Sequence, residues 1–411
     1  MEKYVGVFVP EVLDKLGIGE SIHKAGYKIL VLDKIYNGTK ADMIVRADYT
    51  NIDEMVSVLM QLKTEISIVG LFTASEFAVE SVAAANEILG FEGRASHASV
   101  KRCRNKYLTK IFLREKEVAS GHFMLVNNAK QIKENWPEKC YPLIIKPINA
   151  AGACSVVQID NKDEISNKLK EAQNARKKFP VNDYRKDTTE NYWLVEEYIN
   201  GIEISVECVT FSGETTVIAI HDKYCEVSAP YFVEKRTITP PPRLTANQVE
   251  SIKKIAIQTL KAVEFENGVT HIEYKVGEEG PMLLEINARP AGGLMVESVF
   301  YSTGVNLLKA QLDISLGIKP DVEIKQQVKT TVMNMIPSEE GRVTMIKGFE
   351  EAYNYKEVVM SKPYVWPGFI IKARQAQYGG FVLTCGEDYE KMLSIQEEIE
   401  KNITIGVEKI E

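Results

Sequence analysis

The sequence predicts a mixed α/β protein built from three successive units, and three patterns along the chain carry that prediction. Residues 1–104 alternate short apolar runs with amphipathic stretches, which is typical of a parallel sheet covered by helices. Residues 270–293 have the pattern of a β-hairpin with one polar face. From Lys329 onward, short apolar runs separated by glycines indicate a small α+β lobe. We therefore expect a central unit over 105–318 and a C-terminal lobe over 319–411.

Length and composition indicate a globular protein of ordinary character. The chain has 411 residues, 45% of them hydrophobic, and a net charge of −7, which argues against a general nucleic-acid binder. The six cysteines show no CxxC spacing, so they predict neither a disulfide framework nor a zinc site. No apolar run suits a signal peptide or a membrane span. We expect a cytoplasmic protein that binds neither nucleic acid nor membrane, with a homodimer as the default oligomer.

The first unit alternates predicted strands and helices in chain order. Strands are expected at 5–9, 27–32, 41–47 and 66–72, and helical patterns at 13–26, 55–62 and 77–89. The unit contains no GxGxxG or P-loop pattern, so we assign it no nucleotide. Its expected role is that of a scaffold beside the active centre.

The second unit begins with two segments that could face an anion. Residues 105–106 open an amphipathic helix, and the apolar strand 141–147 carries Lys146 near its end. A lysine in such a strand most often extends its amine to solvent, and that alternative stays open here. The run 150–156 consists of small residues, through which backbone N–H groups can approach an anion closely, although Gly152 is its only glycine.

Three strand-like segments follow a polar stretch. The run 193–199 has the pattern of a strand, 203–209 alternates polar and apolar residues, and Lys223 ends the next piece. Tyr231 and Glu234 lie in a segment that could line a substrate pocket. An ordinary strand with an exposed glutamate is the alternative for that segment.

Two helices have recognisable starts. Thr245 and Gln248 form a capping box before an apolar-periodic stretch that runs to Val263. A terminal helix is expected over 388–401.

The hairpin pattern places four polar side chains on one face. Side chains on a strand alternate between faces, so His271 and Glu273 share a face in the first strand, and Glu285 and Asn287 share one in the second. If the hairpin turns about Glu279, the two glutamates lie opposite each other and the histidine lies opposite the asparagine.

Two carboxylates that face each other across a strand pair repel, and a cation between them relieves that repulsion. Glu273 and Glu285, with the amide oxygen of Asn287, form an all-oxygen set suited to Mg²⁺. Arg289 and then the pair 292–293 follow, where backbone amides could approach a ligand. A solvated polar face is the alternative, but the combination favours a metal and phosphate site.

The ordered set of motifs resembles the ATP-grasp superfamily of ATP-dependent carboxylate–amine ligases, and the resemblance covers nearly the whole chain. It is carried by Asn105-Lys106, Ile145-Lys146-Pro147, the stretch from Val195 to Glu203, and Leu284 to Pro290. The ending EINARPAGG and the C-terminal lobe look most like bacilysin-type L-amino-acid ligases, which join two unprotected amino acids. The resemblance implies an ATP-grasp fold preceded by a Rossmann-like parallel α/β domain. It departs from the family at Asn105, where many relatives have Asp, and in the glycine-poor run after Lys146.

The resemblance implies an ATP site with lysines on two sides of the phosphates. The loop from Gly152 to Ser155 would fold over those phosphates, the backbone from Glu196 to Ile199 would face the adenine, and the Glu203 carboxylate would hold the ribose. The residues implied for nucleotide binding are Lys106, Lys146, Gly152, Ser155, Glu196, Glu197, Ile199, Glu203 and Lys223.

It also implies two Mg²⁺ ions, for which Mn²⁺ could substitute, held by Glu273, Glu285 and Asn287. The residues implied for catalysis are Arg289, Lys146, Gly292 and Gly293. The weaker expectations for substrate contacts are His271, Tyr231, Glu234 and, beside the phosphoryl group, Arg289.

The residue types suit the reaction that the resemblance implies. Phosphoryl transfer from ATP turns a carboxylate into an acyl phosphate, and an amine then displaces phosphate. Both steps accumulate negative charge, which fixed cations stabilise. We expect an ATP-dependent ligase that joins a small carboxylic acid and an amine, with amino acids as the expected pair. The alternatives are a ligase for another acid or amine, a biotin-carboxylase-like enzyme that uses bicarbonate, a non-catalytic nucleotide-binding scaffold, and a structural protein.

Overall fold

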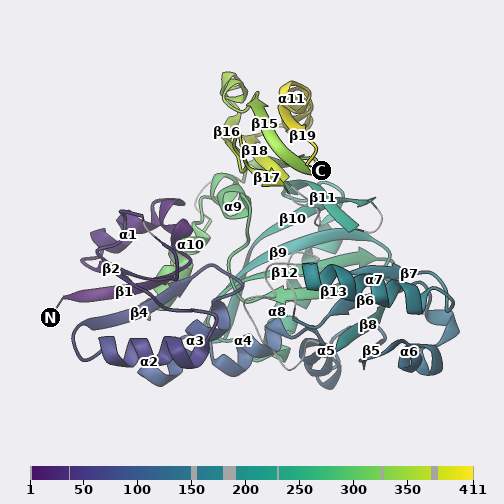
Figure 1. The fold of residues 1–411 in the computed structure, drawn as a ribbon, viewed down its shortest axis with the longest axis horizontal. Coiled ribbons are helices and arrows are strands. Elements are labelled where there is room, and N and C mark those ends of the chain that lie inside the picture. The colour runs from purple at the N-terminus through teal and green to yellow at the C-terminus, as the bar shows by residue number, and fades with distance from the viewer. Residues whose placement is uncertain are drawn as a thin grey trace.

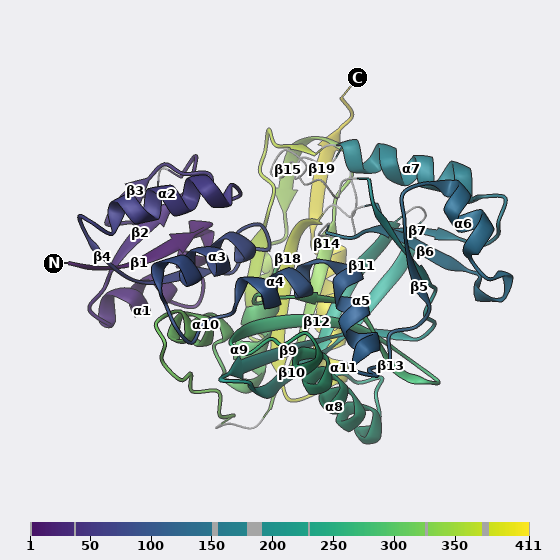
Figure 2. The same ribbon diagram turned by 90° about the horizontal axis from the view of Figure 1, so that it is seen from below.

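The computed structural model shows three lobes around a large central sheet (Figures 1 and 2). The N-terminal lobe and a smaller lobe formed by residues 106–197 lie at opposite ends of the long axis in Figure 1, and we call this smaller lobe the teal lobe. The C-terminal lobe stands above the middle in the same view. The structure describes residues 2–36, 38–149, 155–178, 191–228, 231–324, 328–371 and 378–410. Within these ranges, no helix combines the length and the apolar character needed to cross a membrane.

The N-terminal lobe is a four-stranded parallel sheet, as the alternating pattern predicts. Its strands have the order β3-β2-β1-β4 and comprise β1 (Lys3–Phe8), β2 (Lys28–Leu32), β3 (Met43–Val45) and β4 (Ser67–Thr73). The helical segments of this lobe are η1 (Pro10–Asp14), α1 (Ile18–Lys24), α2 (Ile52–Leu62), α3 (Val79–Leu89) and α4 (His97–Arg104). The single helix expected over 13–26 is two segments, because Leu16 (φ 46°) and Gly17 (φ 68°) take the left-handed conformation between them.

The teal lobe is a four-stranded antiparallel sheet in the order β5-β8-β6-β7. Its elements are α5 (Lys106–Glu115), β5 (Phe123–Val126), α6 (Ala129–Asn135), η2 (Glu138–Cys140), β6 (Leu143–Pro147), β7 (Val157–Ile159), α7 (Ile165–Lys178) and β8 (Trp193–Glu197). Apolar residues of α6 and α7 pack against one face of this sheet. The opposite face contributes to the candidate site.

The central sheet has eight strands in the order β13-β12-β9-β10-β11-β14-β18-β16, and all its neighbouring pairs are antiparallel. Its strands are β9 (Ile202–Phe211), β10 (Glu214–Ser228), β11 (Tyr231–Thr239), β12 (Gly268–Gly277), β13 (Gly280–Asn287), β14 (Thr330–Pro337), β16 (Val358–Pro363) and β18 (Tyr378–Gly386). The sheet therefore crosses the expected boundary at 318. Lys223 lies inside β10 and does not end it, because β10 continues pairing with β11 as far as Ser228.

The predicted hairpin pairing is confirmed. Glu273 lies opposite Glu285, and His271 lies opposite Asn287. The turn is tighter than expected, because Gly277 already pairs with Gly280. A register shift after Glu273 compensates for this: Tyr274 pairs with Leu283, so Leu284 is an extra residue that restores the predicted pairing.

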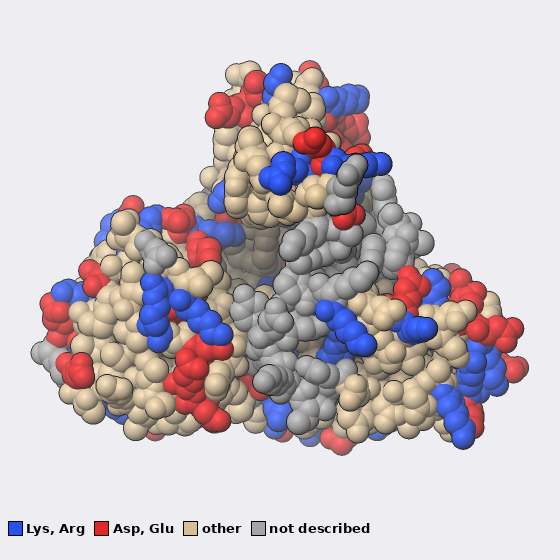
Figure 3. Space-filling model, viewed as in Figure 1, with Lys and Arg blue, Asp and Glu red and all other residues tan. Residues whose placement is uncertain are grey.

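Helix α8 (Ala246–Ala262) covers the apolar face of the hairpin and of β9, and its capping box at Thr245 and Gln248 is present as predicted. The remaining elements form the C-terminal lobe and the segment that connects it to the hairpin. They are α9 (Met295–Thr303), α10 (Leu307–Ser315), β15 (Gly341–Lys347), η4 (Glu351–Asn354), β17 (Ile370–Ile371), α11 (Tyr389–Asn402) and β19 (Thr404–Glu408). Three of these strands form a small separate sheet in the order β17-β15-β19. The surface is hollowed between the N-terminal and C-terminal lobes (Figure 3).

Candidate active site

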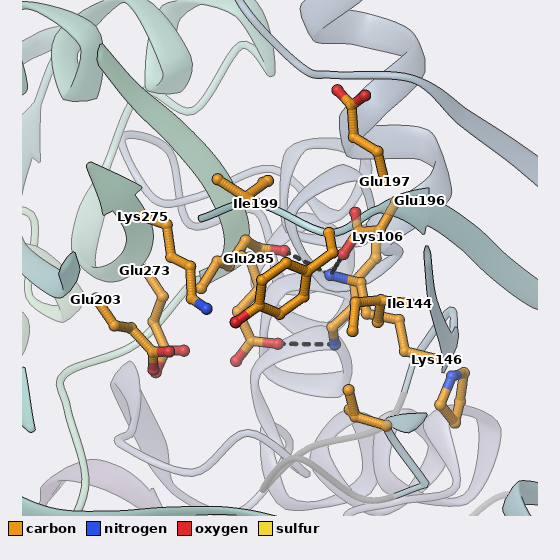
Figure 4. A pocket seen from close by; sticks show the side chains of 14 residues that line it. Lys106, Ile144, Lys146, Glu196, Glu197, Ile199, Glu203, Glu273, Lys275 and Glu285 are labelled. Carbon is orange, nitrogen blue, oxygen red and sulfur yellow. Dashed lines mark hydrogen bonds and ion pairs between the residues drawn. The ribbon is translucent and has the colours of Figure 1, made fainter. Parts of the chain in front are cut away.

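The candidate site is a pocket between the teal sheet and the polar face of the central sheet (Figure 4). It has a cavity volume of about 130 Å³ and opens to solvent. Apolar side chains, among them Ile144, Val156 and Leu284, line it together with charged ones. A pocket with an apolar part and several converging charges is the usual form of a small-molecule site.

Lysines of the teal lobe share one buried carboxylate at this pocket. Glu196 forms ion pairs with Lys110, 3.1 Å away, and with Lys146. Burial would raise the pKa of Glu196, but the two lysines outweigh it and lower that pKa. Burial lowers the pKa of Lys146, and Glu196 partly opposes that effect. Lys146 is only 6% exposed, so it does not extend to solvent.

Lys106 connects the two walls of the pocket. Asn105 caps α5 by accepting from the backbone N–H groups of Tyr107 and Leu108, which fixes the start of the helix. The amine of Lys106 then reaches across to Glu285 Oε2 at 3.0 Å. This ion pair links the first turn of α5 to β13, and it helps to lower the pKa of Glu285 against the effect of burial.

Lys223 lies among three carboxylates on the central sheet. Its Nζ is 3.0 Å from Glu273, 3.2 Å from Glu203 and 3.3 Å from Glu234. Burial alone would lower the pKa of Lys223, but the three carboxylates hold it well above its usual range. Burial has the larger effect on Glu234, whose pKa is raised although Lys223 opposes this. The pKa of Glu273 is lowered, because Lys223 and His271 outweigh its burial.

The pKa values of two histidines beside Lys223 are shifted in opposite directions. His271 contacts Glu207 through Nδ1 at 2.5 Å and Glu273 through Nε2 at 3.1 Å. Burial would lower its pKa, but the two carboxylates raise it to about 9. His221 lies 3.7 Å from Glu207 and hydrogen-bonds Thr239. Its pKa is lowered to about 4, chiefly because it is buried.

Arg289 meets the N-terminal lobe at the end of the hairpin. Its Nε donates to Glu76 Oε2 at 3.0 Å, and one terminal nitrogen lies 3.4 Å from Asn287 Oδ1. Asn287 in turn donates to Glu285 Oε1 at 3.2 Å. The next residues are also held from the N-terminal lobe, since Lys15 donates to the carbonyl oxygen of Gly293 at 2.7 Å.

Two family models match this chain. The model of the ATP-grasp domain matches residues 139–298, which contain every pocket-lining residue except Lys106. The model of the L-amino acid ligase C-terminal domain 2 matches residues 334–408. Residues 139–298 are therefore an ATP-grasp domain, and residues 334–408 match a domain of L-amino acid ligases. The family resemblance predicted from the sequence is therefore confirmed.

Crystal structures of other proteins have a similar fold. The crystal structure of an L-amino acid ligase from Bacillus licheniformis has a TM-score of 0.81 and 24% identity, covering 100% of this chain and 99% of that one. The biotin carboxylase domain of Hydrogenobacter thermophilus 2-oxoglutarate carboxylase, solved with MgADP, ADP and bicarbonate, has a TM-score of 0.73 and 15% identity, covering 99% of this chain and 91% of that one. At these identities the likeness shows the fold alone.

A curated relative, the Sinorhizobium fredii protein called uncharacterized protein y4rH, is 24% identical over 331 residues. The match covers 79% of this chain and 65% of that relative, which is less than two thirds of its length.

The ATP-grasp fold brings most of the expected site residues to one pocket. The pocket is lined by Lys106, Lys146, Glu196, Glu197, Ile199, Glu203, Glu273 and Glu285, together with Lys275, which the sequence did not single out. The side chain of Glu197 points away from the centre of the cavity in Figure 4, and its Oε1 accepts from the backbone N–H of His122 at 3.0 Å. Only its backbone remains for the expected adenine contact.

The other expected residues either lie beside the pocket or are not among the described residues. Lys223, His271 and Asn287 are buried on the same polar face, and Glu234 faces Lys223, so it is not the exposed glutamate of the alternative. Ser155 is buried with a φ of 61°. Gly152 and the side chain of Tyr231 lie outside the described residues. Gly292 is exposed, and Gly293 is partly buried at the Lys15 contact.

Besides Lys275, three residues that contact the expected site residues were not singled out from the sequence. Lys110 follows Lys106 by one helical turn on α5, a spacing that could have revealed it. Glu207 belongs to the same alternating run as Glu203, a pattern that indicated its face but not its partner. Glu76 has no local signal, because its contact with Arg289 joins residues 213 positions apart.

Proposed function

We propose that this ATP-grasp protein is an ATP-dependent carboxylate–amine ligase that joins two amino acids and releases ADP and phosphate. The observation that carries the proposal is a set of ion pairs at the pocket and directly beside it. Lys106 and Lys223 are held by Glu285 and Glu273, two carboxylates that face each other across one hairpin. A site with facing rows of cations and carboxylates is suited to phosphate groups and the metal that accompanies them.

The residues fit ATP as a substrate. Apolar Ile144 and Leu284 line the pocket together with residues of the segment 196–199, and an adenine could lie against them. Lys146 lies deeper, where the γ- or β-phosphate could replace Glu196 as its partner. If a phosphate took that place, Glu196 would keep Lys110 as its partner at 3.1 Å, so its buried charge would not be left unpaired.

The residues also fit Mg²⁺, although the pattern differs from a closed metal site. In the described ranges, no three His, Cys, Asp or Glu side chains form a group that could hold a metal ion. The set proposed here is Glu273, Glu285 and the amide oxygen of Asn287, which supplies hard oxygen ligands but leaves positions for phosphate oxygens. When bound, Mg²⁺ or Mn²⁺ would offset the charge of the transferred phosphoryl group. We propose two such ions by family resemblance.

The chain's own residues would then act on the two substrates. A carboxylate oxygen of the first attacks the γ-phosphorus of ATP, which forms an acyl phosphate and releases ADP. The amine nitrogen of the second attacks the acyl carbon, phosphate leaves, and the nitrogen loses a proton. Arg289 is held by Glu76 at 3.0 Å, and its fixed charge would stabilise oxyanions in both steps.

The preference for amino acids is supported by the C-terminal part of the chain. Residues 334–408 match the L-amino acid ligase C-terminal domain, and the similar Bacillus licheniformis structure carries the name of that activity. The similar biotin carboxylase structure contains bicarbonate, so a bicarbonate-dependent reaction is the competing function to be measured.

The test is ADP and phosphate release with Mg-ATP in the presence of single amino acids, pairs of amino acids, and bicarbonate with biotin. We expect release that requires amino acids, and a product whose mass equals the pair minus water. Release that requires only bicarbonate and biotin would reject the amino-acid ligase. ATP binding without release under any condition would reject catalysis with these substrates.

A further inference from the structure

A fully buried carboxylate lies behind the candidate metal ligands. Glu207 is in the middle of β9, with β10 on one side and β12 on the other, and its side chain has 0% exposure. Its one side-chain hydrogen bond among the described residues is Oε1 with His271 Nδ1 at 2.5 Å. Its second oxygen, Oε2, has no hydrogen-bond partner there.

His271 connects this carboxylate to the pocket. Its Nδ1 faces Glu207 and its Nε2 faces Glu273 Oε1 at 3.1 Å. Ionised carboxylates only accept hydrogen bonds, so a ring between two of them donates at both nitrogens. Glu207 thereby fixes both the rotation of the ring and the nitrogen that faces Glu273.

Glu273 is held through one oxygen only. Lys223 Nζ and His271 Nε2 both contact Oε1, at 3.0 and 3.1 Å. Neither contact involves Oε2, so the carboxylate plane is fixed while this oxygen remains for a cation. Without Glu207, the ring would lose its fixed orientation and Glu273 would lose one of these two constraints.

Packing alone gives no reason for a carboxylate at position 207. Burying a charge with one hydrogen bond costs free energy that an apolar side chain of the same size would avoid. Ile204, Val206 and Cys208 on the same strand face the opposite side and pack in the apolar core with α8, so the apolar packing of β9 does not depend on Glu207. The position of Glu207 behind His271 supplies a reason.

We propose that Glu207 is a positioning residue that acts through His271 to hold Glu273 for the metal ion that accompanies the nucleotide. The inference rests on the proposed function, because it assigns a role in the same metal site. Residues that orient a metal ligand in this way typically change metal affinity about 10–100-fold when they are removed.

The experiment measures Mn²⁺ binding in the presence of ADP from the loss of the free-ion signal in electron paramagnetic resonance. This readout does not depend on turnover. The variants are Glu207→Gln, which keeps an acceptor oxygen, and Glu207→Leu, which keeps none. Thr210→Val is the matched control, because Thr210 is a fully buried polar residue of the same strand, faces the other side, and makes a 2.9 Å side-chain hydrogen bond to Thr215.

We expect Mn²⁺ affinity to fall about 10–100-fold in Glu207→Leu, to fall less in Glu207→Gln, and to stay within about twofold in Thr210→Val. Unchanged affinity in a folded Glu207→Leu would overturn the inference. If the leucine variant does not fold, Glu207→Gln decides, and an affinity equal to that of the wild type overturns the inference. A wild-type protein that binds no Mn²⁺ with ADP would overturn the proposed function and this inference together.

Discussion

The two faces of β9 and β12 show what packing and charge each contribute to this molecule. On one face, Val206, Ile272 and Tyr274 are fully buried under α8. On the other face, Glu207, His271 and Glu273 form a chain of ion pairs, although two of the three are almost as deeply buried. Adjacent residues of one strand therefore lie in an apolar core and in an ionic site.

The difference separates stability from function. The apolar face stabilises the fold in proportion to the apolar area that it buries, and this contribution does not depend on the position of one particular atom. The charged face costs free energy unless every group has a partner in a fixed position. We therefore expect changes on the charged face to affect activity most, and changes on the apolar face to affect the free energy of unfolding most.

The largest effect is expected for Glu285→Ala. Loss of this proposed metal ligand should reduce ADP release about 10²–10³-fold or more, by analogy with the loss of a preorganised charge contact. The melting temperature should stay close to that of the wild type, because the change also removes the repulsion with Glu273 across the hairpin.

Glu279→Ala is the matched control for this change, since Glu279 is an exposed residue in the turn of the same hairpin. It should leave ADP release unchanged. A folded Glu285→Ala protein with wild-type turnover would contradict the claim that the charged face determines activity.

The next effect is expected on the apolar face, from Ile272→Ala. The side chain is fully buried in the core under α8, so its truncation should lower the free energy of unfolding by about 2–5 kcal/mol. Urea denaturation followed by circular dichroism measures this change. The protein that remains folded should keep its turnover number. A large loss of turnover at wild-type stability would contradict the division between the faces.

A smaller effect should appear as pH dependence at His221. Its pKa is about 4 in the folded protein against about 6.5 in the unfolded chain, so the unfolded state binds more protons between these values. The contribution of His221 to the free energy of unfolding should therefore be fully present above pH 6.5 and decline as the pH falls towards 4. At pH 5 this one group accounts for about 2 kcal/mol.

Unfolding curves for the wild type and for His221→Gln between pH 7 and 5 test this. The variant should lose less stability over that interval. Parallel pH profiles would show that His221 does not carry the acid sensitivity.

The smallest effect is expected at the start of α8. Thr245→Ala removes the capping box and should lower the free energy of unfolding by about 1 kcal/mol, with turnover unchanged. Thr245→Ser retains the hydroxyl and should recover most of that loss. Equal melting temperatures for all three proteins would show that the cap contributes nothing measurable.

Patterns of local origin could be predicted from the sequence. The parallel N-terminal sheet follows from alternating strands and helices, and the capping box follows from Thr245 and Gln248. The Glu273–Glu285 pairing was also predicted, but from a wider turn. The structure has a turn of two residues and a bulge at Leu284, and these two differences cancel.

Contacts between distant segments could not be predicted. Nothing near Lys110 in the sequence shows that it shares Glu196 with Lys146, because three elements must meet for that contact to form. Similarly, the pattern placed Glu207 on the polar face, while its contact with His271 depends on the pairing of β9 with β12. Side-chain alternation gives the face of a residue, and only the assembled sheet gives its neighbour.

The contacts of Arg289 with Glu76 and of Lys15 with Gly293 have a consequence for how this chain can be divided. Both connect the first hundred residues to the segment just after the hairpin, which the proposed reaction uses. A fragment that began at Asn105 would retain the walls of the candidate pocket but lose the Glu76 carboxylate and the Lys15 amine that hold this segment. The N-terminal lobe is thus no exchangeable module, and chimeras between relatives should move it together with residues 288–294.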